Sequence, residues 1–283
     1  MLPPGPFPGP FSGPPSGLLS GPLPEALPEA CALPPLQRST ALFLDFDGTL
    51  AEIAPQPDAV QLPAGLLGLL LRLADGLDGA LAIVTGRPLA DLDAFLAPLK
   101  LPVAAEHGAL RRLATGELTE GRPPDLGLAT AVAEALVSQH PGLRLERKTS
   151  SVALHYRQRP ALEAECLAAL AEACDRTPGT ELQRGKCVVE VKPLGVDKGL
   201  AMAGFMKEPP FAGRSPWFAG DDLTDEPGFV WVQQAGGVAV KVGQGATAAR
   251  HRVEGPAVLR AWLQAAARGL PVQPPSLPRG GAS

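Results

Sequence analysis

The chain has 283 residues, of which 45% are hydrophobic, and this is enough for one large domain or two smaller ones with a substantial core. Lys and Arg number 25 against 29 Asp and Glu, and the resulting net charge of −4 argues against a nucleic-acid-binding surface. No stretch approaches the roughly 18 uninterrupted apolar residues of a membrane-spanning helix, so we expect none.

Proline is unusually common, with 33 residues, and residues 1–37 consist largely of Pro, Gly, Leu and Ser. This composition predicts a disordered or polyproline-II tail, which is either inert or docks a partner. The segment has neither the basic region nor the long apolar region of a secretory signal. The four cysteines show no metal-ligand spacing, so we expect reduced thiols in a cytoplasmic protein. Residues 271–283 are predicted to form a second flexible tail.

The first predicted element is the continuous apolar run from Ala41 to Leu44, which is typical of a strand covered on both faces. Gly48 breaks this pattern, so we expect Asp45 at the carboxyl end of the strand, where α/β sheets bind ligands. Asp47 follows two residues later and points the same way, into one cleft. Two close carboxylates need a proton, a cation or many hydrogen bonds, and Mg²⁺ is a natural partner. The alternative is a solvated Asp-Gly turn.

Helices and strands then alternate along the chain. The predicted elements are a helix over 64–77, a strand over 80–84, a short helix over 89–96 and a strand over 103–105. This order favours a parallel sheet with right-handed crossovers. Thr85 follows the second strand, and Glu106 and His107 follow the third. Polar side chains are therefore expected to gather at one edge of the sheet.

The pattern changes between Arg112 and Lys192. Here the sequence predicts a helix over 123–138, strands over 144–148 and 151–157, a helix over 161–174, and strands over 180–183 and 187–191. These strands alternate between polar and apolar residues, which is typical of an antiparallel sheet with one exposed face. We therefore expect an inserted α+β module over 113–191 and a core formed by 38–112 and 192–270.

The α/β pattern resumes after the insertion. The predicted elements are a helix over 198–206, strands over 217–219 and 238–242, and a helix over 257–267. Lys198 begins the first of these helices, and Asp221 and Asp222 follow the strand at 217–219. Two carboxylate pairs, a hydroxyl and a lysine at one sheet edge fit phosphoryl transfer, which needs a nucleophile, a metal and positive charge. A carboxylate is ionised at neutral pH and can attack phosphorus without a general base.

Four motifs resemble, in the same order, those of the haloacid-dehalogenase-like (HAD) phosphatases: DFDGTL, Thr85, Lys198 and GDDLTDE. The resemblance implies an α/β fold with a HAD-like Rossmannoid parallel sheet core and an inserted α+β cap. It implies that Asp45 is the nucleophile, which forms an aspartyl-phosphate, and that Asp47 is the general acid/base. Thr85 would hydrogen-bond the phosphoryl group, and Lys198 would neutralise charge between the phosphate and the nucleophile.

The same resemblance implies a Mg²⁺ site. Asp221 would bind the ion together with the Asp45 carboxylate and the main-chain carbonyl of Asp47. Asp222 would support these ligands, and Asp225 is a further candidate for that support. An acid at position 47 is typical of phosphatases and mutases rather than of dehalogenases.

Further segments resemble the trehalose-6-phosphate phosphatase family over about residues 40–263: TGRP, AEHGA, ERKTSSVALHYR, RGKCVVEVKPLGVDKG and GDDLTDE. In that family a cap closes over the core and holds the sugar with charged side chains. The matching positions here are Glu146, Lys148, Arg157, Lys186 and Glu190. Lys and Arg donate hydrogen bonds and Glu accepts them, so a mixed set can read sugar hydroxyls. The alternative is a solvated face with cross-strand ion pairs.

Three further residues follow the predicted strands at the sheet edge. Gly86 and Arg87 lie in the loop after the second strand and are candidates for substrate binding. Arg87 either lines the cleft or caps a neighbouring element. His107 either contacts the sugar or hydrogen-bonds a loop carbonyl.

The resemblances together imply Mg²⁺-dependent hydrolysis of a small-molecule sugar phosphate, trehalose 6-phosphate, by a monomer. Related phosphatases that act on sucrose 6-phosphate or a glycosylglycerate phosphate would share the core motifs, and the cap residues favour trehalose. A phosphomutase would move phosphate between two sugar positions instead of releasing it. A non-catalytic sugar-phosphate-binding module would have no need for a nucleophile such as Asp45 beside an acid such as Asp47.

Overall fold

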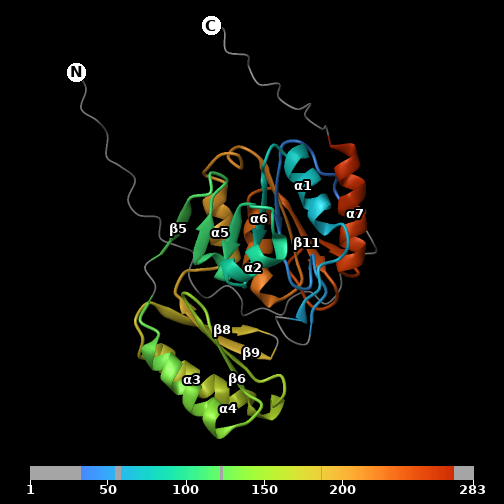
Figure 1. Cartoon of the computed structure of the whole chain (residues 1–283). Helices are drawn as coiled ribbons and strands as arrows, with labels where there is room; N and C mark the ends of the chain where they lie inside the picture. Colours follow the sequence, from blue (N-terminus) through green and yellow to red (C-terminus); the bar gives the residue numbers. More distant parts are fainter. Residues whose placement is uncertain (1–32, 55–58, 122–123, 186, 271–283) are drawn as a thin grey trace, which may run out of the picture.

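The computed structural model describes residues 33–54, 59–121, 124–185 and 187–270, which form two units, each built around its own sheet (Figure 1). The larger unit contains an eight-stranded sheet in the order β12-β11-β10-β1-β2-β3-β4-β5. Its strands are β1 (Thr40–Leu44), β2 (Leu81–Val84), β3 (Val103–Ala105), β4 (Leu110–Arg112), β5 (Leu118–Glu120), β10 (Ser215–Gly220), β11 (Val238–Val242) and β12 (His251–Val253). The strands from β12 to β3 are parallel, whereas β4 and β5 pair antiparallel. The predicted α/β fold with a mostly parallel sheet is confirmed.

Every residue of β1 and β2 is buried, as their continuous apolar sequences predict. Neighbouring residues of a strand point to opposite faces, so complete burial requires that both faces are covered. Helices α1 (Leu66–Gly76) and α7 (Pro256–Gly269) contact each other, as do α5 (Lys198–Phe205) and α6 (Glu226–Gln234). In Figure 1 these two pairs lie apart, with β11 between them. The short helix α2 (Leu89–Leu96) follows β2.

The smaller unit is a four-stranded antiparallel sheet in the order β6-β7-β9-β8 with two helices. Its elements are α3 (Gly127–Gln139), β6 (Arg144–Arg147), β7 (Val152–His155), α4 (Glu163–Asp175) after a 3₁₀ turn at Pro160–Leu162, β8 (Thr180–Gly185) and β9 (Val188–Pro193). Figure 1 shows both helices on the side of this sheet that is turned away from the larger unit. Apolar residues such as Leu154, Leu170 and Val189 form a core there, separate from the core of the larger unit. The opposite face of the sheet is turned towards the larger unit.

The hairpin of β4 and β5 belongs to the large sheet, although the sequence analysis assigned residues from 113 onward to the inserted module. Both strands are short and contain polar residues, so they lack the apolar run that marks the other strands. We therefore propose that the inserted module begins after Glu120. At its other end, β9 continues to Pro193, beyond the predicted boundary at residue 191.

The prediction also missed α6 and β12. Helix α6 begins with Glu226 and Pro227 and continues with Gly228, a composition with low helix propensity. Proline in the first turn costs no helical hydrogen bond, so the helix forms despite this signal. Strand β12 is short and starts with two polar residues.

Other expectations concern the ends of the chain and the cysteines. Residues 1–32 and 271–283 lie outside the described residues, whereas residues 33–37 are described and Leu36 is buried in the core. In the part of the chain that the structure describes, no helix combines the length and the apolar character needed to cross a membrane. Within the same residues, Cys166, Cys174 and Cys187 are free thiols, and the first two are buried.

Candidate active site

The carboxyl ends of β10, β1 and β2 lie side by side, because β1 pairs with both neighbours. The last residue of β1 is in register with Ala219 and Ile83. Asp45, Asp221 and Thr85 follow shortly after these positions, so all three reach the same edge of the sheet. The chain continues from β1 to β2 on one side, while β10 lies on the other. This is a topological switch point, the place where α/β sheets bind ligands.

Lys198 joins Asp45 to Asp225 at this edge. Its ammonium nitrogen lies 2.7 Å from an oxygen of each carboxylate, and all three side chains are at most 6% exposed. Lys198 is the first residue of α5, and the Asp197 side chain caps this helix by accepting the N–H of Leu200 at 2.8 Å. This N-cap fixes the first turn of α5, from which the Lys198 side chain extends to Asp45.

Asp47 is held by Arg87 through two parallel hydrogen bonds. The guanidinium donates from Nε at 2.6 Å and from Nη2 at 2.7 Å, one bond to each carboxylate oxygen. The Arg87 side chain is 9% exposed and lies over the rings of Phe46 and Phe95, whose faces attract a cation. Its N–H also donates to the hydroxyl of Thr85 at 3.2 Å. Of the two alternatives that the sequence left open, the structure places Arg87 in the cleft.

Asp45, Asp221 and Asp225 form an acidic group that fits a divalent cation. Each offers a carboxylate oxygen, and these oxygens lie within 4.8 Å of one another. Asp225 is committed to the protein, because its Oδ2 accepts the N–H groups of Asp221 at 2.8 Å and Asp222 at 3.0 Å, while Oδ1 accepts Lys198. Asp45 and Asp221 are therefore the side chains best placed to bind an ion. Hard cations such as Mg²⁺ are often held by only one or two carboxylates.

Gly48 allows Asp221 to approach the turn that follows β1. Its φ is +80°, and a Cβ at this position would lie 2.1 Å from an oxygen of Asp221, so a side chain would collide with the carboxylate. Asp222 is engaged elsewhere. Its carboxylate accepts the N–H and the hydroxyl of Thr224 at 2.8 and 2.6 Å, in a capping box that starts the short helix η4 (Leu223–Asp225). Its carboxylate is therefore not part of the acidic group.

The acidic group carries more negative charge than Lys198 and the neighbouring Lys241 balance. Burial raises the pKa of Asp45 to about 7, against the opposing effect of Lys198. Burial and the charges of Asp222 and Asp225 raise the pKa of Asp221 to about 7, and burial raises the pKa of Asp225 to about 8. The carboxylates outweigh the burial of Lys198 and raise the pKa of its ammonium. This surplus of negative charge is what a bound cation would neutralise.

Across the cleft, the inserted module presents a row of side chains from all four of its strands. Glu146 on β6 is in register with Ala153 on β7, which pairs with Glu190 on β9, and Glu190 pairs with Gln183 on β8. Residues in register on neighbouring strands point to the same face, and all four line the same cleft as Asp45. The row brings two predicted sugar-binding residues together and adds Gln183, which the sequence analysis missed.

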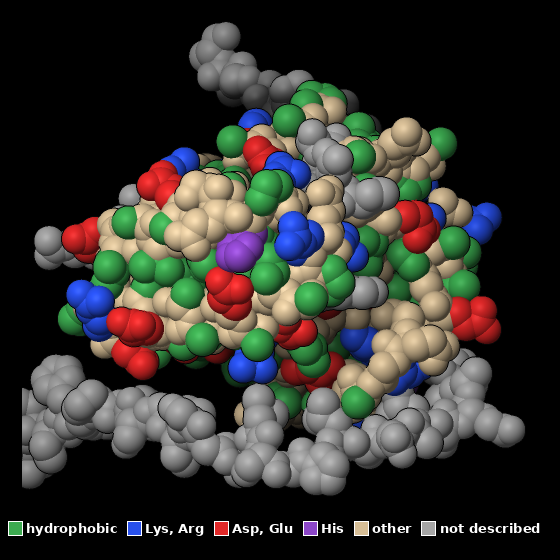
Figure 2. Space-filling model, turned by 90° about the horizontal axis from the view of Figure 1, so that it is seen from below, with side chains coloured by type: hydrophobic (Ala, Val, Ile, Leu, Met, Phe, Trp, Pro, Cys, Tyr) green, Lys and Arg blue, Asp and Glu red, His purple; other side chains and the backbone are tan. Residues whose placement is uncertain are grey.

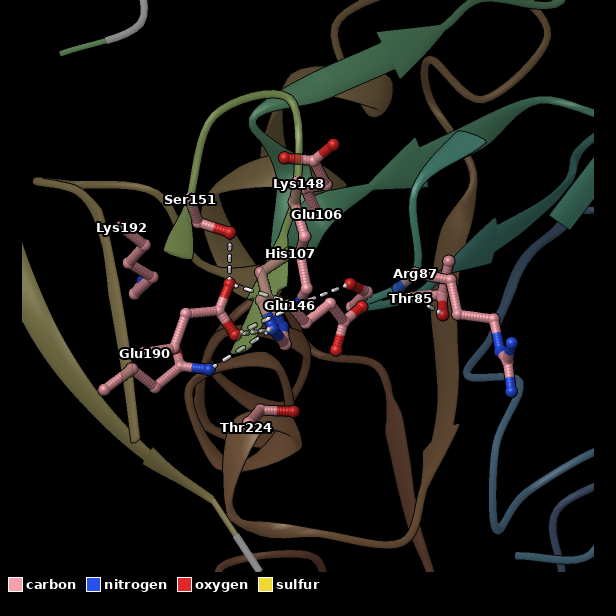
Figure 3. A network of polar contacts seen from close by, with 12 residues as sticks. Thr85, Arg87, Glu106, His107, Glu146, Lys148, Ser151, Glu190, Lys192 and Thr224 are labelled. Atoms are coloured by element: carbon pink, nitrogen blue, oxygen red, sulfur yellow. Dashed lines mark hydrogen bonds and ion pairs between the residues drawn. The ribbon is translucent and has the colours of Figure 1, made fainter. Parts of the chain in front are cut away.

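Glu190 is the centre of a buried network that joins the two units (Figure 3). Lys148 donates to its two oxygens at 3.0 and 3.1 Å and to the carbonyl of Gly86 at 3.0 Å. The hydroxyl of Ser151 also donates to Glu190, and Nε2 of His107 lies 3.7 Å away. Figure 3 shows Ser151 and His107 approaching Glu190 from different directions. Residues of the larger unit and of the inserted module therefore meet around one carboxylate.

Charges in this network are balanced by its own residues. Burial alone would raise the pKa of Glu190, but Lys148, His107 and Ser151 together outweigh it and hold this pKa well below its usual range. Glu190 and Glu146 outweigh burial in turn and raise the pKa of Lys148. Burial lowers the pKa of His107, so its ring is neutral at neutral pH and Lys148 is the cation. His155 lies 2.7 Å from Glu146 and lowers the pKa of that carboxyl.

The edge of the large sheet at Asp45 and the inserted module line one cleft of about 660 Å³, a size typical of small-ligand sites. The other predicted residues that line it are Thr85, Gly86, Arg87, Arg157, Lys198 and Asp222. Lys186 lies outside the described residues, and its role stays a prediction. Gln183 and Ser151 carried no sequence signal, because an amide or a hydroxyl on a strand becomes informative only when the pairing of the strands is known.

The charged surface residues show no single sign on the face seen in Figure 2. There, acidic and basic side chains of both signs are scattered among hydrophobic ones.

Comparison with known proteins identifies relatives of the whole two-unit structure. A family model described as Trehalose-phosphatase matches residues 43–257. The trehalose-6-phosphate phosphatase of Escherichia coli (strain K12) is 46% identical over 235 residues, which cover 82% of this chain and 88% of that protein.

Two solved structures are similar in fold. The C-terminal domain of the C. albicans trehalose-6-phosphate phosphatase has a TM-score of 0.73 at 22% identity, covering 82% of this chain and 93% of that one. A haloacid dehalogenase-like hydrolase from Bacteroides thetaiotaomicron has a TM-score of 0.56 at 14% identity, covering 79% and 98%. At these identities the two structures establish the fold alone, and they confirm the predicted HAD-like α/β core.

Proposed function

Because this chain belongs to the trehalose-phosphatase family, we propose that it hydrolyses trehalose 6-phosphate to trehalose and inorganic phosphate. The observation that carries the proposal is the position of Asp45, held by Lys198 at 2.7 Å, opposite a cleft wall with Glu146, Lys148 and Glu190. The edge of the large sheet supplies a nucleophile for phosphorus. The wall supplies hydrogen-bond donors and acceptors for a sugar.

The first half of the reaction transfers the phosphoryl group to Asp45. Lys198 and Arg87 offer positive charge to the phosphate, and Thr85 offers a hydroxyl. Lys198 holds one oxygen of Asp45, and the other oxygen attacks phosphorus. The bond between phosphorus and the sugar oxygen breaks, its electron pair leaves with the sugar oxygen, and an aspartyl-phosphate remains on Asp45.

Asp47 moves the protons in both halves of the reaction. It first donates a proton to the leaving sugar oxygen, and then takes one from the water that attacks the aspartyl-phosphate and releases phosphate. The two hydrogen bonds from Arg87 hold the Asp47 carboxylate in place in the cleft.

Mg²⁺ is the ion we propose for the acidic group, with Asp45, Asp221 and the main-chain carbonyl of Asp47 as its protein ligands. When bound, the ion would neutralise charge on the phosphoryl oxygens and on the carboxylates. Asp225 holds Lys198 and the N–H groups after β10 in place. Asp222, which was predicted to support the metal ligands, would do so by capping η4, the short helix that contains Asp225.

The cap residues are proposed to select the sugar. Glu146, Glu190 and Gln183 form one row, and Lys148 adds a cation beside it. A site that pairs with each hydroxyl rejects a sugar that leaves its buried polar groups unpaired. Over a bound sugar, this wall would also exclude bulk water from the aspartyl-phosphate. The monomeric state and the cytoplasmic location stay predictions.

Phosphate release from a panel of substrates tests the proposal. The panel contains trehalose 6-phosphate, sucrose 6-phosphate, glucose 6-phosphate and p-nitrophenyl phosphate, each with Mg²⁺ and with EDTA. We expect metal-dependent release with a marked preference for trehalose 6-phosphate. Metal-dependent release with another preference would keep the chemistry and discard the substrate, whereas binding without any release would indicate a sugar-phosphate-binding module.

A further inference from the structure

Glu106 belongs to the larger unit, but its carboxylate accepts hydrogen bonds from the inserted module. It follows β3, in the short helix η2 (Glu106–Gly108), and it is only 3% exposed. One carboxylate oxygen accepts the N–H of Thr149 at 3.0 Å, and the other accepts the N–H and the hydroxyl of Ser150 at 2.8 and 2.7 Å. Thr149 and Ser150 form the turn between β6 and β7. Glu106 therefore binds this turn through three hydrogen bonds.

The backbone around Glu106 is hydrogen-bonded to the loop after β2, called the catalytic loop below, which carries Thr85 and Arg87. Its φ is 48°, in the left-handed region that residues other than glycine rarely adopt, and the φ of His107 is 60°. Such a conformation persists where the surrounding structure holds it. Here the N–H of Glu106 donates to the carbonyl of Arg87 at 3.0 Å, and the N–H of His107 donates to the carbonyl of Thr85 at 2.9 Å. The strained turn is thus anchored to the loop that carries Thr85 and Arg87.

The turn that Glu106 holds carries Lys148. The N–H of Lys148 donates to the carbonyl of Ser151 at 3.0 Å, which closes the turn, and its side chain enters the cleft. There its ammonium bridges Glu190 and the carbonyl of Gly86. Glu106 itself does not line the cleft. The three hydrogen bonds of the Glu106 carboxylate therefore act on the cleft through the turn.

We propose that Glu106 is a positioning residue that docks the turn at Thr149 and Ser150 onto the catalytic loop and thereby places Lys148 over the site. The ionised carboxylate is suited to this task, because it accepts several N–H and O–H groups at once. A glutamine at this position would turn its NH₂ group towards one of these donors. The kinetic part of the proposal rests on the proposed function, and the exchange measurement below does not.

Hydrogen exchange at the turn tests the docking directly. The amides of Thr149 and Ser150 are compared in the wild type, in Glu106→Gln and in Glu117→Gln, which removes an exposed carboxylate from the β4–β5 turn. We expect Glu106→Gln to lower the protection of both amides by about tenfold or more, and Glu117→Gln to leave it unchanged. Equal protection of both amides in wild type and Glu106→Gln would overturn the proposal, whatever substrate the protein uses.

Kinetics then separates positioning from a general loss of structure. In Glu106→Gln, kcat/KM for trehalose 6-phosphate should fall by about tenfold or more, while that for p-nitrophenyl phosphate stays within about twofold. In a Lys148→Ala background, the effect of Glu106→Gln should shrink to within about twofold, because the residue that it positions is gone. Equal losses for both substrates, or an undiminished effect in that background, would overturn the proposal.

A milder variant covers the case in which Glu106→Gln does not fold. Ser150→Ala removes one of the three hydrogen bonds from the other side of the contact. It should lower kcat/KM for trehalose 6-phosphate by about threefold and leave p-nitrophenyl phosphate hydrolysis unchanged. If both the hydrogen exchange of the turn and the turnover of trehalose 6-phosphate stay as in the wild type, the docking role is contradicted. If the wild type does not hydrolyse trehalose 6-phosphate, the proposed function fails, and the exchange measurement alone decides the docking.

Discussion

Two buried groups of carboxylates face the same cleft and are balanced in opposite ways. At the edge of the large sheet, Lys198 pairs with Asp45 and Asp225, and Lys241 lies beside Asp221, yet the pKa values of Asp45 and Asp221 are raised to about 7. Between the two units, Glu190 has Lys148 as its own cation, and its pKa is held well below its usual range. A surplus of negative charge prepares the first group for a cation from solution. The second group is neutralised by its own residues and holds the two units together.

The variant Asp45→Asn should have the largest effect on activity. An amide cannot attack phosphorus, so kcat for phosphate release should fall by roughly 10³-fold or more. The substitution also removes one acid from the overcharged group, so the metal-free variant should be more stable than the wild type at pH 8. Phosphate release and urea denaturation in EDTA measure the two effects. A metal-free variant less stable than the wild type would contradict the surplus of charge.

The variant Glu190→Gln should show the opposite sign of stability change. It leaves Lys148 buried without its counter-charge, and breaking such a buried pair costs roughly 3 kcal/mol of unfolding free energy. Turnover of trehalose 6-phosphate should fall by about 100-fold because the sugar-facing row is disrupted, while p-nitrophenyl phosphate hydrolysis stays within about threefold. Denaturation curves and the two kcat/KM values provide the test. A stabilised variant would mean that the second group is also overcharged.

The pH dependence of stability should separate the two groups without any mutation. Asp45 and Asp221 ionise near pH 3.8 in the unfolded chain but near pH 7 in the folded, metal-free protein. Between these values the unfolded chain releases protons that the folded protein keeps. The free energy of unfolding should therefore fall as the pH rises from about 4 to about 7, by about 1.4 kcal/mol per pKa unit for each group.

Glu190 contributes with the opposite sign, since its folded pKa is depressed. Its stabilising contribution is present above its unfolded pKa of 4.5 and is lost as the pH falls through the lowered folded value. Urea denaturation between about pH 3 and pH 8, with EDTA and with Mg²⁺, measures the contributions of the acidic group and of Glu190. Mg²⁺ should remove the decline between pH 5 and 7, because the bound ion keeps the acids ionised. A decline that persists in saturating Mg²⁺ would argue against a cation in the acidic group.

An exposed ion pair on the inserted module supplies the smallest expected effect. Glu134 on α3 pairs with Arg147 on β6, and both side chains are more than half exposed. Glu134→Gln should change the unfolding free energy by less than about 0.5 kcal/mol, because solvent screens such pairs. Turnover should also stay unchanged, since neither residue lines the cleft. A large effect would mean that removing any carboxylate changes the unfolding free energy, whatever the charge balance of the buried group to which it belongs.

The amino-acid sequence by itself determined where the main strands lie along the chain and about where they end. Apolar runs such as Ala41 to Leu44 can be buried on both faces only as central strands, and Gly48 marks where the first run stops. Because parallel strands end at one edge, the sequence also predicted that Asp45, Thr85 and Asp221 would meet. These conclusions depend on local patterns, which are visible without knowledge of the pairing.

Tertiary structure decided which charged groups became partners. Arg87 binds Asp47 across 40 residues of sequence, Asp225 rather than Asp222 joins the acidic group, and Glu106 grips a turn of the other unit. Gln183 enters the row with Glu146 and Glu190 only through the register of β8 with β9. Burial and the number of cations within reach of each carboxylate then set its pKa. These quantities depend on distances between elements far apart in the chain, and no local pattern of residues contains them.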